Sequence, residues 1–323
     1  AGDLPDAVNF PLLKSEKKNN FRVAVLGDTQ VRNNKEIGYM RDTMVEDLTE
    51  VGTDFAVTLG DNMFNKLSLY PRYLSVIGQL DMPVFYVPGN HDVNFDAPNR
   101  RYSMDTYKRF LGPDYYSFNV GKVHFVALND IAYNGDKYHG ELGETQLRWL
   151  ENDLSFVPKD HVVFLYMHIP IFSWFDGDGR HSVADRQKLY DILDGRKALA
   201  IGGHVHNVEH FRPGQEAKDA GTAPFPVVLA GAVCGSWWSG RPGVTGVPLS
   251  YQREGAPKGY MVYEFDGTDY TGRYRVPHRP ADYQMNISLN RPEGEWANPV
   301  RKVLDPEEVE ETKLVVNFFP GDE

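Results

Sequence analysis

Short apolar segments that alternate with amphipathic segments impose the strongest constraint on the fold of this chain. An apolar run bounded by turn residues is typical of a buried strand, whereas apolar residues spaced three and four apart are typical of a helix. Six segments have the strand pattern, at 21–27, 54–60, 82–89, 161–167, 197–203 and 225–233. Helical periodicity lies between them at 35–52, around 66–80, at 143–157 and at 182–194, and residues 115–130 fit a hairpin with its turn at 119–121. The alternation predicts an α/β fold whose sheet is covered by helices on both faces.

A glycine- and proline-rich loop, SGRPGVTGVPLS at 239–250, predicts the end of this alternating unit. Beyond it, GYMVYEFDGTDYTGRYRV, DYQMNISLN and KLVVNFFPG have strand patterns without convincing helices between them. We therefore expect one domain over 21–250 and a small, mostly β domain over 251–323, which is either complete or continues past residue 323. The polar, proline-bearing residues 1–20 are expected to be a tail or the remnant of a linker.

The charge of the chain argues against a nucleic-acid groove. The chain has 34 Lys and Arg against 45 Asp and Glu, a formal net charge of −11, and no block of basic residues stands out. Binding to a phosphate backbone requires clustered cations. A small phosphorylated substrate would need a local positive centre, for which a metal ion is the simplest source. The single cysteine, Cys234, permits neither an internal disulfide nor a thiolate metal cluster.

Polar groups that follow five of the predicted strands indicate a shared site. In an open α/β sheet, ligands bind outside the carboxyl ends of the strands, so these groups are expected at one edge. They are Asp28 and Gln30, Asp61 in GDN (60–62), Asn90, His91 and Asp92 in GNHD (89–92), His168 in YMHIP, and His204 and His206 in IGGHVHN. Each has an ordinary alternative, because a single Asp is most often a cap and a single His is most often a satisfied core residue. Five such coincidences at strand ends are improbable, which favours a functional site.

The donor atoms indicate the kind of metal. Carboxylates, amide oxygens and imidazoles together suit Mn, Fe or Zn, and suit neither an all-oxygen calcium site nor a thiolate site. Several ligands with carboxylates that can bridge also suggest two ions. We therefore expect two divalent metal ions, with Mn favoured because hard oxygens accompany the imidazoles.

The order D-x-(H/Q), GD(N), GNH(D/E), H and GHxH resembles that of the calcineurin-like metallophosphoesterases. The resemblance covers about residues 21–250 and implies a metallophosphoesterase-type β-sandwich flanked by helices, with a dinuclear metal centre. By matched position, one metal would be held by Asp28, Gln30, His206 and Asp61, and the second by the bridging Asp61 with Asn90, His168 and His204. Because all these positions precede residue 251, the C-terminal unit is expected to be dispensable for metal binding.

The resemblance also implies hydrolysis of a phosphomonoester or phosphodiester. Two divalent cations with the carboxylates of Asp28 and Asp61 would carry a charge of about +2 and attract a phosphate. The metals would lower the pKa of bound water and supply a metal-bridging hydroxide as nucleophile. In the family, the histidine matched by His91 faces the leaving group, so His91 is expected to donate a proton or to stabilise the transition state. Asp92 would either orient His91 or cap the following turn.

Two positions depart from the family pattern. Purple acid phosphatases have a tyrosine three residues after the GDN aspartate, where this chain has Phe64. Without a phenolate ligand, an iron-loaded sample is expected to lack an intense visible absorption band. Gln30 stands where a histidine is more usual, and its neutral amide oxygen is a weaker donor. We expect one metal to be bound more weakly, unless Gln30 only hydrogen-bonds its loop.

Two loops are expected to overhang the metals, FSWFDGDGRH (172–181) and CGSWWSGR (234–241). Their aromatic residues would form a wall for a leaving group, and their arginines would meet a second phosphate or a carboxylate. Loop packing and surface ion pairs explain them equally well. The candidates are Trp174, Phe175, Arg180, Trp237, Trp238 and Arg241.

Two functions compete at this point. The leading hypothesis is a phosphatase or phosphodiesterase acting on a small phosphorylated substrate. The alternative is a carbohydrate- or protein-binding module with a vestigial metal site, suggested by the tryptophans and the terminal strands. The longest apolar run, at 161–174, is too short to span a bilayer. No signal peptide begins the chain, yet analogy with bacterial family members that carry extra β domains suggests an exported or periplasmic location.

Overall fold

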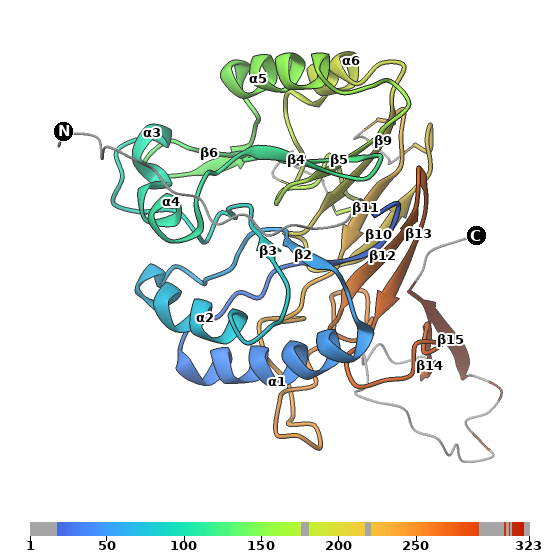
Figure 1. Ribbon diagram of the computed structural model, residues 1–323. Coiled ribbons are helices and arrows are strands. Elements are labelled where there is room, and N and C mark those ends of the chain that lie inside the picture. Colours follow the sequence, from blue (N-terminus) through green and yellow to red (C-terminus); the bar gives the residue numbers. More distant parts are fainter. Residues whose placement is uncertain are drawn as a thin grey trace.

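Two β-sheets packed face to face form the centre of the molecule (Figure 1). The computed structural model describes residues 18–175, 181–216, 221–290, 307, 310 and 312–319. The first sheet has the order β13-β12-β1-β2-β3, with β1 at Asn20–Leu26, β2 at Phe55–Thr58, β3 at Val84–Phe85, β12 at Tyr260–Asp266 and β13 at Asp269–Arg275. The second has the order β10-β11-β9-β8-β5-β4, with β4 at Tyr116–Val120, β5 at Val123–Ala127, β8 at Val162–Tyr166, β9 at Lys197–Gly202, β10 at Val208–Phe211 and β11 at Val227–Ala230.

Aromatic rings fill the space between the two sheets. Phe55 of β2 contacts Phe125 of β5 with ring centroids 5.2 Å apart, and Phe164 of β8 contacts Phe265 of β12 at 5.8 Å. All four side chains are buried. The central strands are covered on their outer faces as well, so their sequences are continuous apolar runs rather than alternating ones. This double burial is the physical origin of the segments that predicted the strands.

Helices cover the outer face of each sheet (Figure 1). The first sheet carries α1 (Asn34–Val51) and α2 (Tyr70–Ile77), the latter preceded by the short 3-10 helix η1 (Leu67–Leu69); the second carries α5 (Glu144–Ser155) and α6 (Arg186–Ile192). The expected β-sandwich flanked by helices is therefore confirmed. Among the described residues, no helix has both the length and the apolarity that crossing a bilayer would require.

Some elements differ from the prediction because they are short. The helix expected at 182–194 is confined to α6, and the hairpin turn follows Val120, which pairs with Val123. The sequence did not predict α3 (Arg100–Ser103), α4 (Asp105–Leu111), β6 (Ile131–Tyr133) or β7 (Tyr138–Gly140). Elements of three to seven residues hold too few apolar positions to establish a period.

The C-terminal strands are arranged differently from the expectation. β12 pairs antiparallel with β1, from Asn20↔Asp266 to Val25↔Met261, and β13 pairs with β12. The first sheet thus includes strands that we expected in a separate unit after residue 250. Of the described strands after residue 250, β14 (Met285–Asn290) and β15 (Lys313–Phe318) form a separate sheet, beside β13 in Figure 1. A division of the chain into two domains stays a prediction. In such a division, β12 and β13 belong with the sandwich, because they are strands of its first sheet.

Candidate metal centre

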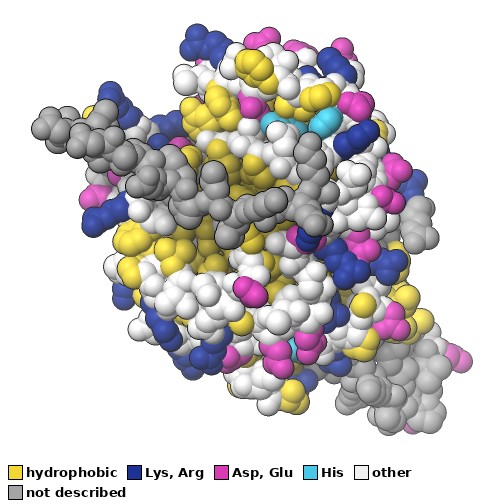
Figure 2. Space-filling view, viewed as in Figure 1, with side chains coloured by type: hydrophobic (Ala, Val, Ile, Leu, Met, Phe, Trp, Pro, Cys, Tyr) yellow, Lys and Arg dark blue, Asp and Glu magenta, His cyan; other side chains and the backbone are white. Residues whose placement is uncertain are grey.

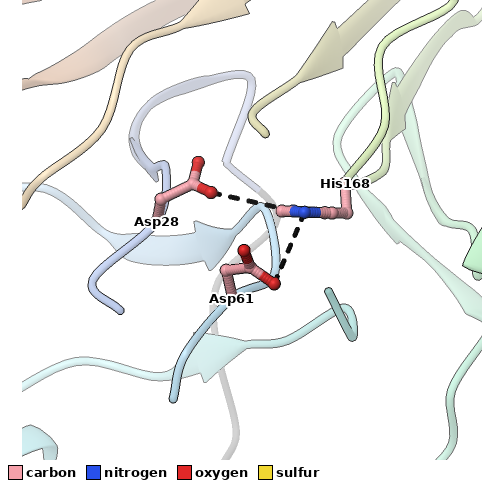
Figure 3. A group of neighbouring side chains, drawn as sticks. All are labelled: Asp28, Asp61 and His168. Carbon is pink, nitrogen blue, oxygen red and sulfur yellow. Dashed lines mark ion pairs between the residues drawn. The ribbon is translucent and has the colours of Figure 1, made fainter. Parts of the chain in front are cut away.

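Loops that follow parallel strands of both sheets meet at one edge of the sandwich. β1, β2 and β3 run parallel in the first sheet, as do β8 and β9 in the second. Asp28 follows β1, Asp61 follows β2 and His168 follows β8, and one ligand atom of each lies within 4.8 Å of the others (Figure 3). All three side chains are buried. The sheets therefore bring together groups that are up to 140 residues apart in the sequence, as the strand-end argument predicted.

The ring of His168 is held in one tautomer by the backbone. Its Nδ1 lies 2.8 Å from the carbonyl oxygen of Leu59, so Nδ1 carries the hydrogen and donates it. Nε2 then has a lone pair, yet it faces Oδ1 of Asn90 at 3.0 Å and Oδ1 of Asp61 at 3.4 Å. Nδ1 of His204 is 3.2 Å from the same atom. A cation between these atoms would satisfy the acceptors that point at one another in the buried site.

A second group of acceptors surrounds Asp28. Nδ1 of His206 lies 2.5 Å from the carbonyl oxygen of Gly235, which leaves the lone pair on Nε2. That atom is 3.6 Å from Oδ1 of Asp28, a buried oxygen with no hydrogen-bond partner in the described part of the chain. Gln30 adjoins this group, and its Nε2 donates to Oδ2 of Asp61 at 2.8 Å. The amide nitrogen of Gln30 rather than its oxygen faces the carboxylate, so its role as a ligand stays a prediction.

Burial sets the protonation of these groups in the metal-free protein. It raises the pKa of the Asp28 and Asp61 carboxyls well above the usual range, with repulsion from neighbouring carboxylates adding to the effect. Burial also lowers the pKa of His168 to about 3 and of His206 to about 4, and that of His204 in the same direction. A bound divalent cation reverses the preference of the carboxyls, because it stabilises carboxylates and needs unprotonated imidazoles. The donor set therefore fits a metal.

Backbone strain is concentrated around the same atoms. Of the ten non-glycine residues with positive φ in the described chain, eight belong to loops at this centre: Asp28, Gln30, Asp61, Asn65, His204, His206, Trp237 and Trp238. Such conformations cost roughly 1–3 kcal/mol each and persist only where the surroundings impose them. Here close packing imposes them, since a Cβ on Gly89 would lie 2.1 Å from the backbone nitrogen of Asp61. The glycine of GNHD is therefore needed for the two loops to approach.

His91 stands at the rim of the centre, with 23% of its side chain exposed. Its Nε2 is 3.9 Å from Oδ2 of Asp61. Its Nδ1 is 2.5 Å from Oδ1 of Asn65, and its ring stacks on Phe64 with centroids 4.4 Å apart. Burial lowers the pKa of His91 to about 4, and the positive charge of Arg32 acts in the same direction. The ring is accordingly neutral at neutral pH and fixed by two neighbours from the loop after β2.

The contacts of Asp92 correct the orienting role expected for it. None of the hydrogen bonds of the described residues joins this buried carboxylate to His91. It accepts five others, from Asn62 N and Nδ2, Gly89 N, Met63 N and Tyr70 OH. These bonds tie the GDN loop to the GNHD loop, so Asp92 positions the loops, which is close to the capping alternative.

The tryptophans after β11 have different surroundings. Trp237 packs against the ring of His206, with centroids 4.8 Å apart, and so borders the centre. Trp238 is only 5% exposed, and its Nε1 donates to the carbonyl oxygen of Thr29 at 2.9 Å. Trp238 therefore supports the loop after β1 from within the core, and its expected place in an aromatic wall is wrong.

The other expected substrate contacts are not joined to the centre by any contact of the described residues. Trp174 and Phe175 are about half exposed, at 45% and 49%, and Trp174 packs on Phe211 with centroids 5.2 Å apart. Arg241 is exposed on the loop after β11. Arg180 lies outside the described residues. Their roles toward substrate stay predictions.

Three residues next to the centre were not among the site residues predicted from the sequence. Asn65 contacts His91 as described above, His181 places its ring 5.1 Å from that of His204, and Sγ of Cys234 is 3.8 Å from Oε1 of Gln30. Asn65 follows Asp61 by four residues in the loop after β2. His181 and Cys234 belong to the two loops expected to overhang the metals, at 172–181 and 234–241, but the sequence did not show which of their side chains reach the centre.

Comparison with known families identifies this arrangement. A family model described as calcineurin-like phosphoesterase matches residues 21–208, more than half of the chain. A second model, described as the C terminal of calcineurin-like phosphoesterase, matches residues 228–323. The second match begins within β11 and includes β12 and β13, so both models contribute strands to the sandwich.

Curated relatives share part of the chain. The serine/threonine-protein phosphatase CPPED1 of Homo sapiens is 31% identical over 133 residues, covering 39% of this chain and 42% of the relative. The probable glycerophosphodiester phosphodiesterase GpdQ of Arcobacter nitrofigilis is 29% identical over 159 residues, covering 48% of this chain and 56% of the relative. The chain thus spans about half the length of these relatives.

Solved structures show the same fold. PhoD superposes with a TM-score of 0.58 at 14% identity, covering 80% of this chain and 66% of that chain. The purple acid phosphatase PPD1 from yellow lupin seeds gives a TM-score of 0.55 at 14% identity, covering 80% of this chain and 51% of that one. The fold, the order of motifs at the strand ends and the family model over residues 21–208 agree: this chain belongs to the calcineurin-like phosphoesterase family.

Proposed function

We propose that this chain hydrolyses phosphate esters at a centre of two divalent metal ions. The observation that carries the proposal is the convergence of buried acceptor atoms on Nε2 of His168 and on Oδ1 of Asp28. One ion would be held by Asp28, Gln30 and His206, the other by Asn90, His168 and His204, and Asp61 would bridge them. Manganese is the favoured ion because carboxylate and amide oxygens accompany the imidazoles.

Two such ions, when bound, would bind the oxygens of a phosphoryl group and lower the pKa of a coordinated water toward neutrality. The chain's own residues would do the rest. His91 would direct Nε2 at the phosphate or its leaving group, with Asn65 fixing the Nδ1 edge and Phe64 the face of the ring. Because the pKa of His91 is lowered to about 4, this histidine would act as a neutral hydrogen-bonding group that stabilises the transition state.

The substrate would be small and phosphorylated. On the face shown in Figure 2, basic and acidic side chains are interspersed and no broad basic groove appears, in keeping with the net charge of −11. The relatives are named as phosphatases and as phosphodiesterases, so monoester and diester substrates are both within the proposal. A chromogenic aryl phosphate and its bis-ester distinguish them.

The test is hydrolysis of 4-nitrophenyl phosphate and of its bis-ester by chelator-treated protein, before and after Mn²⁺ is added. We expect Mn²⁺ to restore hydrolysis of at least one ester. Asp61→Asn should lose both bound metal and activity, because a bridging carboxylate neutralises both cations. The matched control is Asp269→Asn, whose carboxylate is 91% exposed and remote from these loops in the first sheet. A folded protein that hydrolyses neither ester with any divalent metal would instead support the binding-module alternative.

A further inference from the structure

Three planar groups stack side by side from the metal centre outward. The rings of His91 and Phe64 are 4.4 Å apart and nearly parallel, at an interplanar angle of 19°. Cζ of Arg32 lies 4.6 Å from the centroid of the Phe64 ring. Since His91 covers one face of Phe64, the guanidinium can approach this closely only over the other face. Exposure increases along the stack, from His91 and the half-buried Phe64 to the exposed Arg32.

The charge of Arg32 has no acidic partner in the described residues. Among their hydrogen bonds and ion pairs, the only one that Arg32 makes uses its backbone nitrogen, which donates to Oε2 of Glu36 at 2.7 Å. Glu36 belongs to the cap of α1, where Asn33 accepts from the backbone nitrogens of Lys35 and Glu36. The guanidinium lies over Phe64 in a cation–π contact, and the Arg32 side chain is exposed to solvent, where an anion can reach it.

We propose that Arg32 binds an anionic group carried by the leaving-group part of the substrate. This rests on the proposed function, because His91 marks the leaving-group side only if the centre hydrolyses phosphate esters. A carboxylate or a second phosphate would meet the N–H edge of Arg32 while the first phosphate lies at the metals. The preferred substrates are then phosphate esters whose alcohol part is itself anionic. The phosphate and this second anionic group would be separated by about the thickness of the stack formed by His91, Phe64 and Arg32.

A second arginine provides a matched control. Arg253 is also exposed, lies over an aromatic ring with Cζ 5.5 Å from the Trp237 centroid, and makes no ion pair in the described chain. Trp237 packs against His206 rather than against His91, so Arg253 stands beside the other metal position. If the effect were only the general positive field near the centre, the two arginines would contribute equally.

The experiment measures binding rather than turnover. Calorimetry on Mn²⁺-loaded protein compares ω-carboxyalkyl phosphonates of increasing chain length with the matching ω-amides, which have the same shape without the charge. We expect one chain length at which the carboxylate binds about three- to tenfold more tightly than the amide, the range of a partly exposed charge-assisted contact. The preference should disappear in Arg32→Gln and persist in Arg253→Gln.

Three results would overturn the proposal: no chain length at which the carboxylate is preferred, a preference that survives in Arg32→Gln, or an equal loss in both variants. Hydrolysis of 4-carboxyphenyl phosphate and of 4-carbamoylphenyl phosphate is measured in parallel. These rates distinguish a wrong assignment of Arg32 from a wrong proposed function. If both esters are hydrolysed with no dependence on Arg32, only the assignment of Arg32 is wrong. If neither is hydrolysed and no phosphonate binds, the proposed function itself fails.

Discussion

At the scale of single residues, three histidines at the centre are anchored in the same way. Nδ1 of His168, His206 and His91 contacts an oxygen of the protein, and in each case Nε2 is left facing Asp28 or Asp61. A hydrogen bond at one ring nitrogen fixes both the tautomer and the direction of the other. These anchors lie 26 to 109 residues away along the chain, so no local pattern in the sequence could have identified them.

The role of His91 is open to a direct test by His91→Ala. The variant should keep its metals, because no metal is assigned to His91, and lose on the order of 10²–10⁴ in kcat. The loss should be smaller for esters of acidic phenols, whose leaving groups need less stabilisation. Metal content and kcat are measured on the same sample of the variant. If both decrease together, His91 is a metal ligand or a structural residue.

Gln30 is tested by Gln30→His, with the affinity of both metal positions followed by titration with Mn²⁺. Imidazole is a stronger donor than a neutral amide oxygen, so the position shared by Asp28 and His206 should bind more tightly. The position of Asn90, His168 and His204 should change little, which makes it the internal control. Unchanged affinity at both positions would mean that Gln30 only hydrogen-bonds Asp61, as its amide nitrogen does in the structure.

At the scale of elements, a buried ion pair joins α1 to the C-terminal strands. Asp47 of α1 accepts from Nη2 of Arg275 at 2.6 Å and from the hydroxyl of Tyr260 at 2.6 Å. Burial alone would raise the pKa of Asp47, but these hydrogen bonds, with a further one from the backbone nitrogen of His278, lower it below its usual value. The carboxylate is therefore stabilised in the folded protein relative to the unfolded chain.

Asp47→Asn should lower the free energy of unfolding by about 2–4 kcal/mol at neutral pH, because the Arg275 side chain, only 14% exposed, loses the negative charge with which it pairs. A folded pKa below the unfolded one stabilises the protein above the unfolded pKa, and this stabilisation is lost as the pH falls through the folded value. The difference between wild type and variant should thus shrink below about pH 4. Denaturant titrations at several pH values measure it. Asp42→Asn, exposed on the same helix, is the control, and a pH-independent difference would contradict the account.

The strength of each element's sequence signal follows from how it is buried. Strands covered on both faces, such as β8 and β11, give uninterrupted apolar runs and were predicted within a few residues. The order of polar groups after the apolar strands predicted that Asp28, Asp61 and His168 lie together. The position of β12 next to β1 was not predictable in this way, because an apolar pattern shows that a strand is buried but not which strand it pairs with.

At the scale of the whole molecule, the sandwich is closed by strands from the end of the chain. β12 and β13 contribute Tyr260, Met261, Tyr263, Phe265 and Tyr274 to the buried core. At roughly 1.5–3 kcal/mol for each buried side chain, their loss is comparable with the whole stability of a typical domain. All the proposed ligands precede residue 251. The sheet whose strands lead to Asp28 and Asp61, however, also includes β12 and β13, which follow that residue.

Truncation separates the two views of the C-terminal region. A chain that ends at residue 250 should fail to fold and should bind no metal, contrary to our expectation from the sequence that residues 251–323 are dispensable. A chain that ends at residue 284 keeps β12 and β13 and should bind metal, with lower stability because it lacks Phe319, which packs on Tyr274. Circular dichroism and bound Mn²⁺ report both outcomes. A folded, metal-binding chain that ends at residue 250 would show that β12 is not needed.

The most direct measurement of the central claim is the rate of 4-nitrophenyl phosphate hydrolysis as Mn²⁺ is added stepwise to exhaustively demetallated protein, with the bis-ester in parallel. The account predicts negligible hydrolysis without metal and a rate that rises until two equivalents of Mn²⁺ are bound per chain. Full activity in the demetallated protein, or a rate that saturates at a single equivalent, would contradict a centre of two metal ions.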